Sequence, residues 1–119
     1  HRVVDWRYAK MRSKYKNKPQ DAGGYTYHSI KEAKYARDLQ LRVEAGDIAG
    51  WGRQIKERLY GQNGSHICDY YVDFLIHHKD GTQELVEVKG FETRDWRIKW
   101  MLLEDKYKGD HNLRLTIGK

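Results

Sequence analysis

The sequence of 119 residues predicts an α/β fold, in which a small mixed β-sheet is flanked by helices in the order α-β-β-β-α-β. Two segments, 29–45 and 94–107, space their apolar residues as amphipathic helices do. Between them lie runs of strand-forming residues, and residues 67–90 contain an Asp-Gly turn signal. A short apolar run, 113–117, follows the second helix and predicts a final strand.

The first helix is predicted to begin at Ser29 and to end before Gly46. Ser29-x-x-Glu32 matches a capping box, and glycine commonly follows the last helical residue. The helix places Glu32 on one stripe with Ala36, Leu39 and Val43. Glu32 therefore has two interpretations: its carboxylate caps the helix start, or it projects from the apolar stripe toward a functional site.

Residues 51–60 have strand character and are followed by a polar loop, 61–65. The next two strands form a hairpin around Asp80-Gly81, and its loop length decides its register. A two-residue loop would place Asp73 opposite Val88 and turn Glu87 to the other side of the sheet. A three-residue loop, which suits a turn closed by left-handed glycine, would place Asp73 opposite Glu87.

The three-residue loop gathers chemically useful side chains on one face. Lys89 shares the face of Glu87 because side chains alternate along a strand. The carboxylates of Asp73 and Glu87 and the ammonium group of Lys89 would then lie close together. The opposite face would receive an apolar set: Val72, Phe74, Ile76, Val86 and Val88.

Thr93 or Asp95 can cap the second helix, and Gly109 ends it. The buried stripe of this helix is predicted to comprise Trp96, Trp100, Leu103 and Tyr107. Near its start, Arg94, Arg97 and Lys99 either contact phosphates or form a solvated face.

The chain is predicted to be one domain, residues 25–119, preceded by a basic arm and linker, residues 1–24. The formal net charge is +6, and residues 1–20 hold seven basic residues and one acidic residue, which accounts for the whole excess. Such an arm is typical of nucleic-acid binding, although a solvated tail has the same composition. The candidate DNA contacts in the arm are Arg7, Lys10, Arg12, Lys14 and Lys16.

Carboxylates beside a lysine suit a divalent-metal site for phosphodiester hydrolysis. Carboxylate oxygens bind hard cations such as Mg²⁺, which activate water and neutralise phosphate charge. Lysine can orient the water and offset developing negative charge. The histidines do not suggest zinc, because His77 and His78 point to opposite faces and no Cys-x-x-Cys accompanies them.

The pattern D-x13-E-x-K, from Asp73 to Lys89, resembles the PD-(D/E)XK nuclease signature. With Y-H-S-I-K-E-A-K-Y, W-G-R-Q, Y-Y-V-D-F and V-E-V-K-G-F, it is similar to a phage-associated endonuclease family of that superfamily, formerly a domain of unknown function. The similarity extends from Tyr25 to the C-terminus. One departure is Val72, which stands where proline usually precedes the aspartate.

The resemblance implies a restriction-endonuclease-like core and Mg²⁺-dependent DNA cleavage, with Mn²⁺ able to substitute. It implies that Asp73 and Glu87 hold the metal with the Val88 carbonyl, that Lys89 orients water, and that Glu32 adds a carboxylate. Gln54 is a further candidate, on the central sheet near the site. The sequence shows no sequence-reading module such as a helix-turn-helix, and a domain of this size has little surface for base contacts, so we expect branched DNA, such as junctions or flaps, as the substrate. The resemblance implies phage replication or recombination as the setting.

Other expectations concern the setting of the protein. The single cysteine, Cys68, excludes an internal disulfide and fits the cytoplasm, which is the host cytoplasm if a phage encodes the chain. No apolar run approaches the length of a membrane span. A homodimer would supply two active sites for a junction. The alternative function is a catalytically inactive DNA-binding module of the same fold.

Overall fold

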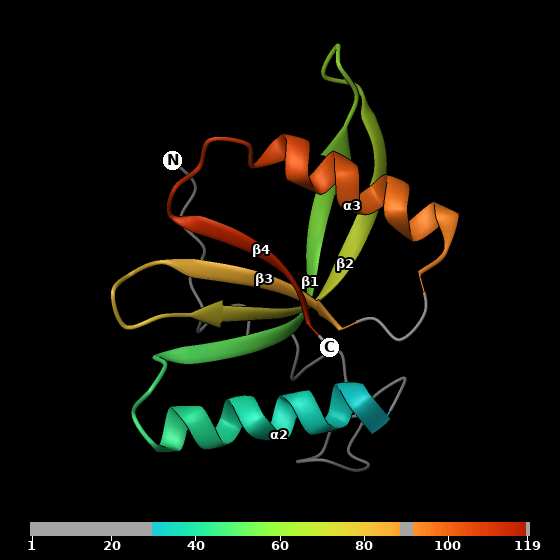
Figure 1. Ribbon diagram of the computed structural model, residues 1–119. Coiled ribbons are helices and arrows are strands. Elements are labelled where there is room, and N and C mark those ends of the chain that lie inside the picture. Colours follow the sequence, from blue (N-terminus) through green and yellow to red (C-terminus); the bar gives the residue numbers. More distant parts are fainter. Residues whose placement is uncertain (1–29, 89–91, 119) are drawn as a thin grey trace.

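The computed structural model describes residues 30–88 and 92–118 (Figure 1). The elements follow the predicted order, helix, three strands, helix, strand. They are α2 (Ile30–Glu44), β1 (Gly50–Tyr60), β2 (His66–His77), β3 (Gln83–Val88), α3 (Arg94–Lys106) and β4 (Leu113–Gly118). In the part of the chain that the structure describes, neither helix is long and apolar enough to cross a membrane.

The four strands form one mixed sheet in the order β1-β2-β3-β4. The β1–β2 and β2–β3 pairs are antiparallel, and β3 pairs with β4 in parallel. Parallel neighbours need a crossover connection, and α3 supplies it between β3 and β4. The predicted α/β fold with a small mixed sheet is thus confirmed.

The β2–β3 hairpin has the three-residue loop. His77 pairs with Gln83, and the His78 amide donates a hydrogen bond of 2.9 Å to the Thr82 carbonyl. Gly81 has a φ of 92°, a left-handed conformation that a side chain would disfavour. This register, continued along the strands, aligns Asp73 with Glu87.

Local signals place the helix ends as expected. Gly46, with φ of 79°, follows α2. Thr93 is the cap of α3, since its side-chain oxygen accepts a 3.1 Å hydrogen bond from the Trp96 amide. The predicted stripe of α3, Trp96 to Tyr107, is buried in full.

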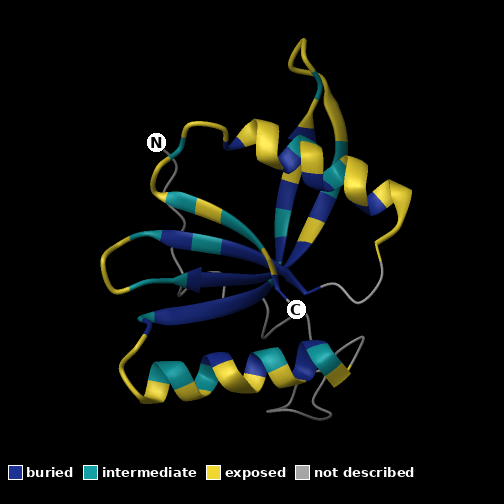
Figure 2. Ribbon diagram, viewed as in Figure 1, coloured by how far each residue is buried: buried dark blue, intermediate teal, exposed yellow. Residues whose placement is uncertain are grey.

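Two separate hydrophobic clusters hold the layers together. Figure 2 shows that the buried residues are concentrated on the strands, while both helices alternate between buried and exposed residues. The α2-side core lies between α2 and the sheet and includes Leu39, Ile48, Trp51, Phe74, Ile76, Val86 and Val88. The α3-side core lies under α3 and includes Ile55, Leu59, Tyr70, Val72, Leu75, Leu85, Trp96, Trp100, Leu103 and Tyr107. Because neighbouring residues of one strand enter different cores, the two helices cover opposite faces of the sheet.

The long strands β1 and β2 bend where they pass between these cores. Phe74 belongs to the α2-side core, whereas Val72 belongs to the α3-side core, although an uninterrupted strand would keep both on one face. In β1, Gln54 has a φ of 55°, the left-handed region, at the corresponding position. The prediction that Val72 shares a face with Phe74 is therefore wrong, because it assumed a regular strand. Figure 1 shows β1 and β2 turning from β3 toward α3.

Candidate functional site at the bend of the sheet

Three buried carboxylates lie at the bend. Glu32 comes from the first turn of α2, Asp73 from β2 and Glu87 from β3. Their exposed fractions are 5%, 8% and 5%. Carboxylates are seldom buried without partners, because removing a charge from water is costly. The partners of each carboxylate therefore define the site.

The side chains of Asp73 and Glu87 accept hydrogen bonds from backbone amides where the β2–β3 ladder ends. The last paired residues are Phe74 and Val86. Beyond them, the Asp73 amide donates to Glu87 Oε1 at 3.3 Å, and the Val88 amide donates to Asp73 Oδ2 at 2.9 Å. The side chains thereby replace ladder hydrogen bonds that the bend interrupts. The pairing of Asp73 with Glu87 follows from the three-residue hairpin loop.

Glu32 faces this pair from α2. Its Oε1 lies 3.5 Å from Nη2 of Arg53, and both side chains are buried. Its side chain also forms a hydrogen bond with Asp73. These contacts place the Glu32 carboxylate at the bend, beside Asp73. Ser29, the partner in the capping interpretation, lies outside the described residues.

The cluster keeps Asp73 protonated near neutral pH. Burial raises the pKa of Asp73 to about 8, and the charges of Glu87 and Glu32 and the hydrogen bond with Glu32 act in the same direction. The hydrogen bond from the Val88 amide acts in the opposite direction. The hydrogen-bonded proton therefore stays on Asp73, and the cluster carries less negative charge than three ionised carboxylates would.

Tyr70 closes the site on the α3 side. Burial raises the pKa of Tyr70, as do the charge of Glu87 and a hydrogen bond with that side chain. The hydroxyl therefore keeps its proton and donates to Glu87, while it accepts a 2.8 Å hydrogen bond from Trp96 Nε1. Tyr70 thus links the carboxylates to the second helix.

Arg53 and Tyr70 are site residues that the sequence interpretation missed. Arg53 occupies an alternating position between Trp51 and Ile55, where strand periodicity calls for an apolar side chain. A charged residue at such a position is a signal of a buried ion pair. Tyr70 carries no comparable signal, because tyrosine is common in strands.

The donor set fits a hard divalent cation, since carboxylate oxygens are the ligands that Mg²⁺ prefers. As the side chains stand, the carboxylates form a hydrogen-bonded cluster and not a preformed coordination sphere. Across residues 30–88 and 92–118, no three His, Cys, Asp or Glu side chains converge closely enough to hold a metal ion. Binding a cation would have to displace the Asp73 proton.

The remaining sequence candidates are more scattered. Gln54 is half-buried and falls between the pairs Arg53–Phe74 and Ile55–Val72, level with Asp73. Of the α3 candidates, Arg94 is exposed, Lys99 is half-buried, and Arg97 pairs with Glu92. Lys89 and the arm residues Arg7, Lys10, Arg12, Lys14 and Lys16 lie outside the described residues.

A model of the family described as "Protein of unknown function (DUF1064)" matches residues 12–118. The chain belongs to the DUF1064 family. No curated protein and no solved structure matches it significantly. In this DUF1064 protein the match includes all three carboxylates of the bend and all the described helices and strands.

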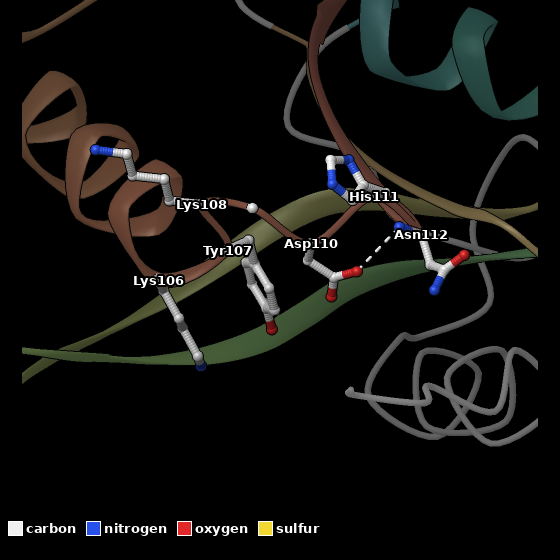
Figure 3. Close-up of a pocket in the computed structure, with 7 residues that line it drawn as sticks. Lys106, Tyr107, Lys108, Asp110, His111 and Asn112 are labelled. Atoms are coloured by element: carbon white, nitrogen blue, oxygen red, sulfur yellow. Dashed lines mark hydrogen bonds between the residues drawn. The ribbon is translucent and has the colours of Figure 1, made fainter.

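The DUF1064 chain also has an open hollow of about 580 Å³ at the C-terminal end of α3 (Figure 3). Residues 106–112 line it, and none of the three carboxylates of the bend does. In Figure 3 the Asp110 carboxylate turns toward the Asn112 backbone N–H, from which it accepts a 2.9 Å hydrogen bond, while Lys108 points away. The hollow is therefore a feature of this turn and is separate from the acidic site.

The raised pKa of Asp73 predicts how stability depends on pH. The unfolded carboxyl loses its proton above about pH 4, whereas the folded one keeps it up to about pH 8. Without metal, the free energy of unfolding should therefore fall as pH rises through this window, by an amount on the order of a few kcal/mol. Thermal unfolding in EDTA at pH 5 and pH 8.5 measures this. Asp73→Asn should remove most of the difference, and an unchanged difference in that variant would contradict the assignment.

Proposed function

We propose that this chain is a metal-dependent DNA endonuclease that hydrolyses phosphodiester bonds. The observation that carries the proposal is the acidic cluster of Glu32, Asp73 and Glu87 at the bend. Within it, Glu87 directly precedes Val88 and stands two residues before Lys89. The D-x13-E-x-K spacing and the α-β-β-β-α-β order support membership of the PD-(D/E)XK superfamily. Buried acids that share a proton are also a recurrent feature of catalytic sites.

The residues of the cluster would divide the work. Asp73 and Glu87 would hold the cation together with the Val88 carbonyl, and Glu32 would add a third carboxylate. When bound, Mg²⁺ lowers the pKa of water and neutralises charge on the phosphate, and Mn²⁺ can substitute. Lys89 orients the attacking water. Arg53 compensates part of the charge of Glu32, which keeps the cluster compatible with folding before a cation binds.

The proposed substrate is DNA chosen by its branched structure. The basic arm, residues 1–20, supplies a sequence-independent attraction to phosphates. A domain of this size offers little surface for reading bases, which favours selection of junctions or flaps by shape. A symmetric homodimer would present two such sites to a junction. The resemblance of the motifs to a phage-associated endonuclease family supports a role in phage DNA replication or recombination, and the single cysteine fits the cytoplasm.

The test is cleavage of plasmid, flap and four-way-junction DNA with Mg²⁺, Mn²⁺ or EDTA. We expect metal-dependent cuts that follow the branch point when the arm sequences are permuted. Cuts that follow a base motif would replace structure selection with sequence selection. Binding without metal-dependent cleavage would overturn the enzyme and favour the inactive DNA-binding module.

A further inference from the structure

Gln54 is an anomaly within β1. Among the described residues it is the one non-glycine residue with positive φ, at 55°. It stands in the middle of a strand, level with Asp73, at the bend where β1 passes from one core to the other. Left-handed backbone is energetically unfavourable for side chains other than those of glycine and, to a lesser degree, asparagine.

The bend alone does not account for glutamine at this position. Glycine would form the same backbone without the unfavourable contacts of Cβ, and β1 uses glycine nearby at Gly50 and Gly52. Strained residues of this kind are concentrated at active sites, where the side chain has a task. The glutamine side chain is therefore the feature to explain.

The amide of Gln54 is available for a ligand. The side chain is half-buried, and within residues 30–88 and 92–118 no hydrogen bond or ion pair engages it. Its neighbours on the ladder differ in this respect: Arg53 pairs with Glu32, and Asp73 binds the Val88 amide. A neutral amide beside acidic groups can donate to a phosphate oxygen without competing for the cation.

We infer that the Gln54 carboxamide donates a hydrogen bond to a non-bridging oxygen of the scissile phosphate. This inference rests on the nuclease function proposed above. The bend holds the residue level with Asp73, so that cation ligands and the phosphate contact come from adjacent strands. The contact should strengthen as negative charge develops on the phosphate, and it therefore acts mainly on kcat.

Gln54→Gly separates the backbone from the side chain. This variant keeps the left-handed conformation and relieves its strain, so the melting temperature should stay the same or rise. Single-turnover cleavage with Mg²⁺ should fall by at least about tenfold, while DNA binding in EDTA should stay within about twofold. Gln54→Asn, which tolerates the backbone and keeps an amide, should recover part of the rate. Gln54→Glu should be the least active, because its charge repels the phosphate.

Lys56→Gly is the matched control. Lys56 lies two residues further along β1, is half-buried, and has no positive φ. Glycine there should lower the melting temperature while the cleavage rate of the folded protein stays near wild type.

The outcomes distinguish this inference from the proposed function. If wild type shows no metal-dependent cleavage, the nuclease proposal fails and this inference falls with it. If wild type cleaves and Gln54→Gly cleaves within about twofold of it, only the Gln54 inference is overturned. A large fall in melting temperature for Gln54→Gly would also overturn the Gln54 inference. It would show that the glutamine side chain stabilises the fold, whereas the inference assigns it a role in binding phosphate.

Discussion

Asp73→Asn is expected to abolish metal-dependent cleavage, with a fall in rate of roughly 10³-fold or more. The variant removes a negatively charged ligand at the centre of the cluster. Its amide has the same shape, can accept from the Val88 amide and can donate to Glu32, as protonated Asp73 does. Folding should therefore survive, and at pH 8 the variant should be at least as stable as wild type.

Asp69→Asn is the matched control for this prediction. Asp69 lies four residues earlier in β2, at the surface, where it contacts His66 at 2.8 Å and Lys56 at 3.6 Å. Its loss should leave cleavage near the wild-type rate. The measurements are cleavage rates with Mg²⁺ and thermal unfolding of each variant. An Asp73→Asn protein that cleaves at a rate near wild type would remove Asp73 from the mechanism.

Lys106→Met is expected to destabilise the fold by about 3 kcal/mol. The Glu57 side chain is fully buried, and its Oε1 accepts hydrogen bonds from Lys106 Nζ at 3.0 Å and from the Tyr107 hydroxyl at 2.6 Å. Without Lys106 the carboxylate stays buried and loses its ion-pair partner. These contacts join the end of α3 to β1, so denaturant unfolding should show the loss directly.

The double variant Glu57→Met/Lys106→Met is the informative control. It removes the buried charge together with its partner, and it should be more stable than Lys106→Met alone. A second control is Arg58→Ala, at the exposed position that directly follows Glu57. It should change the free energy of unfolding by about 0.5 kcal/mol or less. A single variant as stable as wild type would show that the ion pair is not needed to bury Glu57.

Much of the fold was predictable because its signals are local. The Asp80-Gly81 signal predicted the hairpin and limited it to two registers; the structure has the register of the three-residue loop, which brings Asp73 next to Glu87. The spacing of Trp96, Trp100, Leu103 and Tyr107 predicted the buried face of α3, and Thr93 was one of the two predicted caps for its start. Each of these depends on residues close in sequence, for which backbone preferences are strong.

The bend was not predictable, because residues 51–60 have strand character throughout and no residue type marks the interruption. Nothing in the residue type of Gln54 indicates left-handed backbone. Because the bend was not foreseen, Val72 was predicted to lie on the same face of the sheet as Phe74, which is wrong. The buried charges Arg53 and Glu57 are a related case. Their partners, Glu32 and Lys106, lie about 20 and 49 residues away, so the pairs exist only once the chain has folded.

The division of the hydrophobic core at the bend has a consequence for native-state fluctuations. α3 packs on β1 in the α3-side core, while α2 packs on β1 and β3 in the α2-side core. Each half thus has its own packing and can open locally as a separate cooperative unit, with its own amide hydrogen-exchange rate. The carboxylates lie at the boundary of these units, where side chains stand in for the ladder. When the two halves fluctuate separately, the distances between the carboxylates change. A bound cation would fix these distances and so couple the two halves.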